Sequence, residues 1–138
     1  MKLRASAVAS VFGLPDFPVA LNNRAWAYFR LGKGAMGLDD VERSLQLSPT
    51  NANALDKRAH IYRTLGRLQE ALHDYDQVMF YGGAPMIKLY QCGLTDAHLY
   101  TGGIDGTLRL ELSQALERCV QDKGCDPLSV DERIKLCR

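Results

Sequence analysis

The side chains that could do acid–base or nucleophilic chemistry are scattered along this chain of 138 residues. The three histidines are His60, His73 and His98. None of them belongs to a nucleophile elbow, a phosphate-binding loop or a metal motif. The glycines Gly102, Gly103 and Gly106 are not a dinucleotide fingerprint, because no predicted strand precedes them. The sequence therefore predicts a protein that is not an enzyme and that needs no metal or other cofactor.

The cysteines are the other reactive side chains, and all four follow residue 85: Cys92, Cys119, Cys125 and Cys137. An even number within a unit of about 50 residues predicts two disulfides and an oxidising compartment such as the periplasm. Of the three possible pairings, Cys119–Cys125 would span a helix end and a glycine turn, and Cys92–Cys137 would tie down the last segment. The alternative is four reduced thiols, with Cys92 and Cys119 in the core. We expect no zinc site, because no Cys-x-x-Cys pair is present.

An internal repeat of 34 residues indicates the elements that must position these side chains. Residues 17–50 and 51–84 are identical at nine aligned positions, where chance would give roughly two. The identical pairs are Ala20/Ala54, Leu21/Leu55, Arg24/Arg58, Ala25/Ala59, Tyr28/Tyr62, Leu31/Leu65, Gly32/Gly66, Leu38/Leu72 and Asp40/Asp74. This period is typical of helix–turn–helix arrays, which expose long surfaces to partners. The sequence therefore predicts an all-α protein that binds rather than catalyses.

The repeated residues resemble the tetratricopeptide (TPR) family. The matching positions are Ala25, Tyr28, Gly32, Leu45 and Pro49 in the first unit, and Ala59, Tyr62, Gly66, Ala71, Tyr75 and Met79 in the second. The alanines would let two helices approach closely, and Gly32 and Gly66 would end the first helix of each unit in a left-handed conformation. Three positions depart from the family pattern. The first unit has Gly37 where the second has Ala71, the second has Gly83 where the first has Pro49, and the usual tryptophan at the opening position is missing.

The TPR resemblance implies a concave groove lined by the first helix of each unit, where a protein or peptide would bind. The residues predicted to line it are Asn22, Trp26, Phe29, Arg30, Asn53, Asp56, Lys57, His60 and Arg63. Trp26 and Arg63 are of the types most often found as binding anchors. Alternatively, Trp26 and Phe29 pack against a preceding half-unit. Asn22 and Lys57 are not the types with which chaperone adaptors of the family clamp a carboxylate, so that partner class is not expected.

Residues 86–138 follow a Gly-Gly-Ala-Pro break and predict a small helical unit, with helices over 86–99 and 108–120 and a short one from Val130. A third repeat there fits less well. The unit resembles the three-helix peptidoglycan-binding domains of bacterial cell-wall enzymes, and the matching residues are Gln91, Tyr100, the turn 103–106, Ala115 and Leu116. In that turn Ile104 should enter the core, Asp105 should accept backbone N–H bonds and Gly106 should adopt a positive φ. The alternative is a helical cap on the repeats.

The first 16 residues continue the register backwards, since Val11 and Pro15 precede Leu45 and Pro49 by 34 residues. They predict a half-repeat; the alternative is a signal peptide, because Lys2 precedes an apolar stretch. Hydrophobic residues make up 46% and charged residues 24%, with a net charge of +1. No basic stripe points to nucleic acid, and no apolar run approaches the roughly 20 residues of a membrane span.

Taken together, the sequence predicts a TPR array over 1–85, with a half-repeat 1–16 and repeats 17–50 and 51–84, followed by the unit 86–138. Its predicted function is to bind a peptide or protein partner in the groove without catalysis. The alternatives are a cell-envelope module that binds peptidoglycan through 86–138, or the regulatory tail of a larger enzyme. The predicted setting is bacterial and periplasmic, with the cytoplasm as the alternative.

Overall fold

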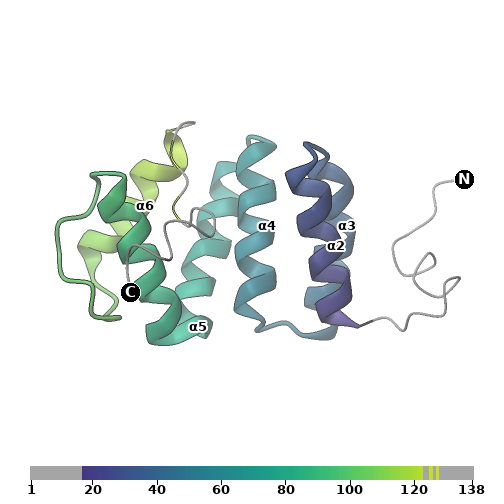
Figure 1. Cartoon of the computed structure of the whole chain (residues 1–138), viewed down its shortest axis with the longest axis horizontal. Coiled ribbons are helices and arrows are strands. Elements are labelled where there is room, and N and C mark those ends of the chain that lie inside the picture. The colour runs from purple at the N-terminus through teal and green to yellow at the C-terminus, as the bar shows by residue number, and fades with distance from the viewer. Residues whose placement is uncertain (1–16, 123–124, 126, 128–138) are drawn as a thin grey trace, which may run out of the picture.

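The computed structural model describes residues 17–122, 125 and 127, and this part of the chain is helical without strands (Figure 1). Its helices are α2 (Pro18–Arg30), α3 (Gly34–Leu47), α4 (Ala52–Thr64), α5 (Leu68–Asp96) and α6 (Leu110–Gln121). The predicted all-α, TPR-like array is confirmed. The helices predicted over 1–14 and from Val130 lie outside the described residues, as does Cys137.

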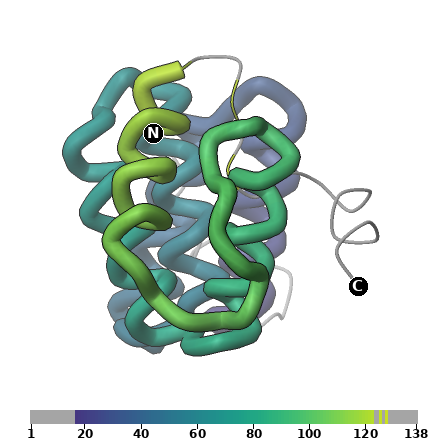
Figure 2. Tube along the Cα trace, turned by 90° about the vertical axis from the view of Figure 1, so that its left-hand side faces the viewer, coloured from purple at the N-terminus to yellow at the C-terminus, as the bar shows by residue number. Residues whose placement is uncertain are grey.

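The helices form a row of pairs along the long axis of the molecule (Figure 1). Helix α2 packs on α3, α4 packs on α5, and α5 packs on α6, while α4 also contacts α2 and α3. Figure 2 shows the last part of α5 and α6 side by side at one end of the row. The first helices of successive pairs are α2, α4 and residues 84–96 of α5, and we call the side that they form the inner face.

Two glycines at equivalent positions end α2 and α4. Gly32 and Gly66 have φ of 75° and 78°, the left-handed conformation that costs glycine least. The N–H of the following residue then reaches back, from Lys33 to the Tyr28 carbonyl and from Arg67 to the Tyr62 carbonyl, each at 2.8 Å. These are the bonds of a Schellman cap. The repeated glycines therefore turn the chain in the same way in both units.

Helix α5 contains the predicted break. Gly83 has φ 65° and ψ −159°, outside the helical region, and separates residues 68–82 from 84–96. The second segment ends at Asp96 rather than at the predicted Leu99, because His98 adopts a φ of 62° and the N–H of Leu99 bonds to the Leu94 carbonyl at 2.9 Å. Helix α6 begins two residues later than predicted, at Leu110.

One hydrophobic core runs through all the pairs, from Ala25 on α2 to Val120 on α6. Ala25 and Ala59 are completely buried, in keeping with the predicted close approach of the helices. Gly37 on α3 has a specific reason to lack a side chain, since a Cβ there would lie 2.6 Å from the Ala25 carbonyl oxygen. The departure from the family pattern at this position thus allows α3 to touch the backbone of α2.

Candidate partner-binding site

The inner face begins with a pair of stacked aromatic rings on α2. Trp26 and Phe29 are one turn apart and therefore share a side of the helix. Their ring centroids are 4.9 Å apart with an interplanar angle of 13°. Both side chains are half-buried. A rigid, partly open aromatic surface of this kind can hold an apolar or aromatic group of a partner.

Behind this pair, further rings continue across the neighbouring helices. The imidazole of His60 on α4 lies 5.6 Å from the Trp26 ring and 6.1 Å from the Phe29 ring. Its Nδ1 is 2.8 Å from the hydroxyl of Tyr75 on α5, and the Tyr75 ring meets that of Tyr90 edge-on at 5.8 Å. The aromatic pair on α2 is therefore backed by a buried, hydrogen-bonded set of rings.

Asp56 places a buried carboxyl within this set. The Tyr90 hydroxyl donates to Asp56 Oδ1, and the Nε2 of His60 lies 3.6 Å from the same oxygen. Burial raises the pKa of Asp56 to about 7, although the hydrogen bond from Tyr90 and the charge of Lys57 act in the opposite direction. Asp56 and Tyr90 are 34 residues apart, so the contact joins equivalent positions of successive units.

Three of the residues predicted to be exposed in the groove are buried instead. Asn22, Asp56 and His60 are only 5%, 7% and 3% exposed. For Asp56 and His60 the reason is the volume of Tyr75 and Tyr90, which fill the space that helical spacing alone leaves open to a ligand. These three side chains thus support the face rather than contact solvent.

The basic residues predicted for the groove have different surroundings. Arg30 on α2 is exposed, as is the polar Asn53 on α4, whereas Lys57 and Arg63 on α4 are half-buried. Burial lowers the pKa of Lys57, while the neighbouring Asp56 raises it. The Arg63 guanidinium donates to the backbone carbonyl of Asp122, just after α6, at 2.6 Å. Arg30 lies one turn from Trp26 on α2 and so places a positive charge beside the aromatic pair. Arg63, one of the predicted anchors, already has an intramolecular partner.

Two surface hollows, of about 360 and 270 Å³, are lined by none of the nine predicted residues. The first is lined by Glu42, Leu45, Gln46, Pro49, Leu55, Arg58 and Gln77, and the second by Arg58, Tyr62, Gln69, Glu70, His73 and Asp74. Arg58 belongs to both and makes two hydrogen bonds to the buried Asp74 carboxylate, at 2.7 and 2.8 Å. The sequence reasoning did not identify these hollows.

The same ion pair occurs in the first unit, where Arg24 contacts Asp40 at 2.7 and 3.1 Å. Burial raises the pKa of Asp40, and the hydrogen bond from Arg24 opposes that shift. Both partners are among the nine repeated positions, which was the signal available in the sequence. Each pair joins the first helix of a unit to its second. The repeated charged residues therefore hold the two helices of each unit together.

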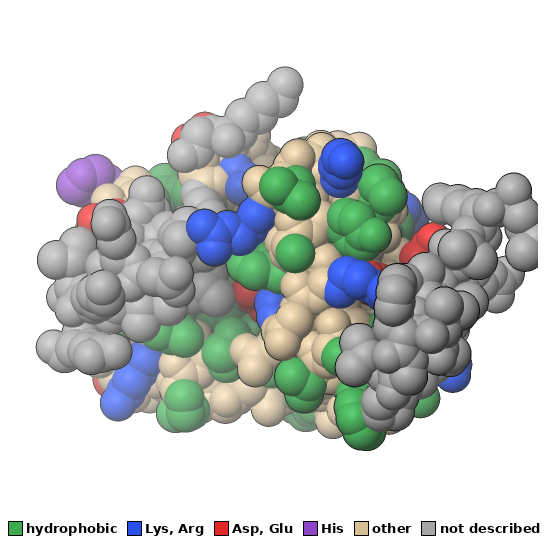
Figure 3. Space-filling model, turned by 45° about the vertical axis from the view of Figure 1, so that its right-hand side comes forward, with side chains coloured by type: hydrophobic (Ala, Val, Ile, Leu, Met, Phe, Trp, Pro, Cys, Tyr) green, Lys and Arg blue, Asp and Glu red, His purple; other side chains and the backbone are tan. Residues whose placement is uncertain are grey.

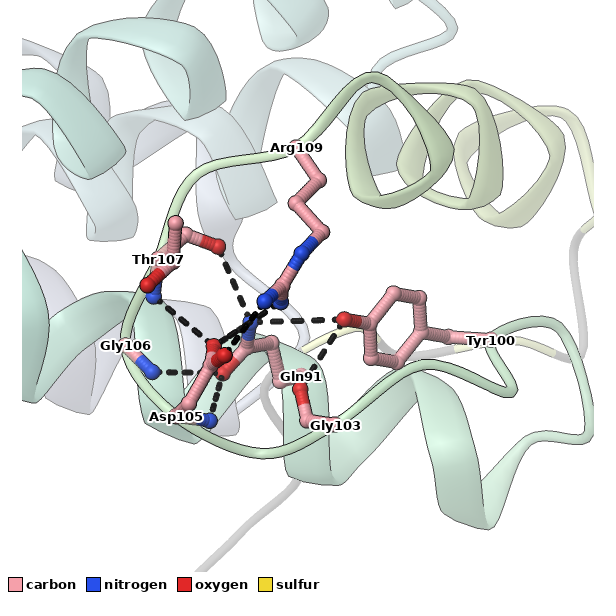
Figure 4. Close-up of polar contacts among 7 residues, drawn as sticks. All are labelled: Gln91, Tyr100, Gly103, Asp105, Gly106, Thr107 and Arg109. Carbon is pink, nitrogen blue, oxygen red and sulfur yellow. Dashed lines mark hydrogen bonds and ion pairs between the residues drawn. The ribbon is translucent and has the colours of Figure 1, made fainter.

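Gln91 and Tyr100, two of the residues that resemble a peptidoglycan-binding domain, form hydrogen bonds with the loop 97–109 (Figure 4). Gln91 is completely buried. Its Oε1 accepts the N–H groups of Asp105 and Gly106 at 3.0 and 2.9 Å, and its Nε2 donates to the Thr107 carbonyl at 3.1 Å. The Tyr100 hydroxyl donates to the Gly103 carbonyl at 2.9 Å. All of these contacts fix the loop.

The turn itself agrees with the sequence prediction at two positions and differs at one. Asp105 accepts the Thr107 N–H at 3.0 Å, and Gly106 has a φ of 76°. Two hydrogen bonds that Arg109 donates to the Asp105 carboxylate are the main reason why the pKa of Asp105 is lowered. Ile104, predicted to point into the core, is 43% exposed. The prediction was wrong because hydrogen bonds from Gln91 and Tyr100 hold the turn in place. The turn therefore does not need an apolar side chain in the core.

Cys119 and Cys125 form a disulfide with a Cα–Cα distance of 5.3 Å. Cys92 is also disulfide-bonded, but the predicted pairing with Cys137 falls outside the described residues. Within the part of the chain that the structure describes, no group of three or more histidine, cysteine or acidic side chains could hold a metal ion. No helix in that part is long and apolar enough to cross a membrane.

About half of the chain is similar to known proteins. It is 41% identical over 70 residues to sperm-associated antigen 1 of Mus musculus and 38% identical over 65 residues to RNA polymerase II-associated protein 3 of the same species. It is 30% identical over 63 residues to small glutamine-rich tetratricopeptide repeat-containing protein 2 of Mycosarcoma maydis. These segments cover 51%, 47% and 46% of this chain. No family model and no solved structure matches it.

The matched segments make up 8%, 10% and 18% of the relatives' own lengths, so the chain spans less than a fifth of the curated relatives it matches. One relative has tetratricopeptide repeats in its name, which supports the TPR resemblance. These relatives are eukaryotic. They give no support to the predicted bacterial and periplasmic setting or to peptidoglycan binding.

Proposed function

We propose that this chain is a non-enzymatic interaction module that binds a peptide or protein segment on the inner face, at the edge shared by α2 and α4. The observation that carries the proposal is the stacked pair of Trp26 and Phe29. It is half-open to solvent and rests on the buried His60. Arg30, one turn from Trp26 on α2, adds an exposed positive charge beside it. Such a surface suits a segment with an apolar or aromatic side chain next to acidic ones.

We further propose that residues 84–122 serve as a cap on the array rather than as a peptidoglycan-binding unit. Their core is continuous with that of the repeats, and Tyr90 reaches across to Asp56 on α4. The residues behind the peptidoglycan resemblance, Gln91 and Tyr100 among them, are engaged in holding their own loop. The proposed binding surface of the chain therefore lies on the repeats, on the inner face.

The cellular compartment can be decided by thiol chemistry. The Cys119–Cys125 disulfide supports an oxidising compartment, whereas four free thiols would favour the cytoplasm. Two disulfides make the intact chain about 4 Da lighter than its reduced form, because each removes two hydrogen atoms. The test is intact mass of the natively expressed protein, with thiols blocked at lysis.

The binding proposal is tested with peptides selected from a random phage-displayed library against the immobilised chain. Trp26 is the chain's single tryptophan, so its fluorescence reports directly on a peptide that reaches the inner face. We expect Trp26→Ala to weaken binding of a fluorescein-labelled selected peptide by roughly 30-fold or more, equivalent to about 2 kcal/mol.

The matched control is Phe80→Ala, which removes an aromatic side chain on α5 that is 75% exposed, and it should leave affinity unchanged. Far-UV circular dichroism verifies the fold of both variants. Selected peptides that bind both variants as tightly as the parent, without changing Trp26 fluorescence, would place the binding surface elsewhere.

A further inference from the structure

Asp56 and His60 place an acid and a base side by side in the interior of the array. Both lie on α4, one turn apart, and they are only 7% and 3% exposed. The Nε2 of His60 is 3.6 Å from the Oδ1 of Asp56, a few tenths of an ångström beyond the usual range of a hydrogen bond. Two ionisable groups this close bind and release protons as a pair rather than independently. We call Asp56 and His60 the buried pair.

Helix α5 holds the buried pair from one side. The Tyr75 hydroxyl and the Nδ1 of His60 are hydrogen-bonded at 2.8 Å, and the Tyr90 hydroxyl donates to the Oδ1 of Asp56. Both tyrosines are completely buried. A net charge on the pair is therefore poorly solvated and acts over a longer distance than it would in water.

Other charged groups near the buried pair come from α4 itself and from α3. On α4 they are Lys57, which is half-buried, and Arg63, which donates to the Asp122 carbonyl at 2.6 Å. Burial lowers the pKa of Lys57 from its ordinary value of 10.5. Helix α3 contributes Glu42, which accepts from the Tyr62 hydroxyl at 3.4 Å, more than half a turn around α4 from the histidine. Lysine, arginine and tyrosine ordinarily titrate at about pH 10 or above, and carboxylates at about pH 4. Among these groups the buried pair is the one that changes charge near neutrality.

On its other side the buried pair faces α2. The His60 ring lies 5.6 Å from the Trp26 ring and 6.1 Å from the Phe29 ring, neither of which titrates. Arg30, one turn from Trp26, is exposed. Figure 3, in which the α2 end of the molecule comes forward, shows basic side chains among hydrophobic ones at the surface. A charge on the buried pair thus lies close to the surface that we propose for a partner with acidic side chains.

We propose that Asp56 and His60 hold one proton in common, and that its loss near neutral pH weakens the binding of an acidic segment at the aromatic pair. The part that concerns binding rests on the proposed function. While the buried pair holds the proton it has no net charge, whether the proton is on the carboxyl or on the imidazole beside a carboxylate. When the proton leaves for solvent, one negative charge stays behind Trp26 and Phe29.

The direction of the pH dependence follows from this change of charge. Burial raises the pKa of Asp56 to about 7, so the proton is held below neutrality and released above it. The negative charge that remains repels the acidic side chains of a partner. Affinity for an acidic segment should therefore fall as the pH rises through about 7.

The fluorescence of Trp26 tests the shared proton without a ligand, because this single tryptophan lies beside the His60 imidazole. We expect the emission of the parent to follow one transition between about pH 5.5 and pH 8.5. Asp56→Asn should abolish the transition. His60→Gln should move its midpoint by about one pH unit or more, because the remaining carboxyl then titrates alone. The matched control is His73→Gln, which removes an exposed histidine on α5 and should leave the transition unchanged.

Far-UV circular dichroism at each pH verifies that the variants remain folded, and if one variant unfolds the other decides. Emission of the parent that does not change with pH overturns the proposal. A transition that persists unaltered in Asp56→Asn or in His60→Gln also overturns it, and so does a transition that disappears in His73→Gln.

The effect on binding is tested with an acidic, histidine-free, N-acetylated peptide from the phage selection whose binding Trp26→Ala weakens. We expect the parent to bind it about tenfold more weakly at about pH 8 than at about pH 6, and Asp56→Asn to bind it equally at both. Equal affinity of the parent at both pH values overturns the switch and leaves the proposed function in place. If no selected peptide depends on Trp26, the proposed function fails and the binding part of this inference fails with it. The shared proton is still decided by the fluorescence titration.

Discussion

Asp56→Asn should change how the stability of the protein depends on pH. The pKa of Asp56 is raised from 3.8 to about 7, chiefly because burial removes water from the charged carboxylate. In the unfolded chain the pKa of Asp56 returns to its ordinary value of 3.8. Folding therefore favours the protonated form. The contribution of this group to stability is fully present below pH 3.8 and is lost as the pH rises through about 7.

The size of the effect follows from the difference between the two pKa values. The pKa values of 3.8 and about 7 differ by about 3, and each pKa unit corresponds to about 1.4 kcal/mol. Ionisation of Asp56 should thus cost the folded protein about 4 kcal/mol between about pH 4 and pH 8. Asparagine keeps an oxygen for the Tyr90 hydroxyl and carries no charge. We expect the variant to be more stable than the parent near pH 8 by up to about 4 kcal/mol, and to lose that advantage near pH 4.

The assay is urea unfolding at intervals across this pH range, followed by far-UV circular dichroism and by the fluorescence of Trp26. The control is Asn53→Ala, which changes an exposed, uncharged side chain on α4 and removes no titrating group, so its stability difference from the parent should stay constant with pH. Parallel stability curves for the parent and Asp56→Asn would refute the reasoning. They would mean that Asp56 is hydrated in the folded protein, or that another buried group compensates its charge.

Three other variants test the packing. Gly37→Ala should lower the unfolding free energy by about 1–3 kcal/mol in urea titrations, because its Cβ would lie 2.6 Å from the Ala25 carbonyl oxygen. Gln91→Leu should cost about 2–4 kcal/mol, since it leaves the two N–H groups of residues 105–106 without their acceptor; unchanged exchange of those amides would contradict this. Replacing Cys119 and Cys125 together by alanine should cost about 2 kcal/mol more in oxidised protein than in dithiothreitol, where only the packing of the two buried side chains is lost.

The repeat made much of the fold predictable, because each repeated residue does the same job twice. Gly32 and Gly66 end helices with the same φ, and Ala25 and Ala59 are completely buried. The repeated Arg24 and Arg58 pair with carboxylates of the following helix. Residues that are identical at a spacing of 34 have the same surroundings in both units, even where the sequence does not predict which contact they make.

Burial on the inner face was less predictable. Helical spacing identifies the side of α4 on which Asp56 and His60 lie, but not the size of the side chains that the next helices bring against them. Tyr75 and Tyr90 fill that space. The loop 97–109 was difficult for a similar reason, since one buried amide, Gln91, replaces the apolar anchor that the pattern predicted at Ile104.

The third helix pair shows how the array continues where the repeat signature stops. Past Gly83 the repeat matches poorly, since Asp96 and Tyr100 stand where the tyrosine and glycine of the repeat are expected. Tyr90 nevertheless stands 34 residues after Asp56 and bonds to it. A polar contact between equivalent positions thus joins the second unit to the third. Asp56 and Tyr90 are both buried and fill the inner face beyond His60. The proposed binding surface is therefore the edge between α2 and α4, where Trp26 and Phe29 remain partly exposed.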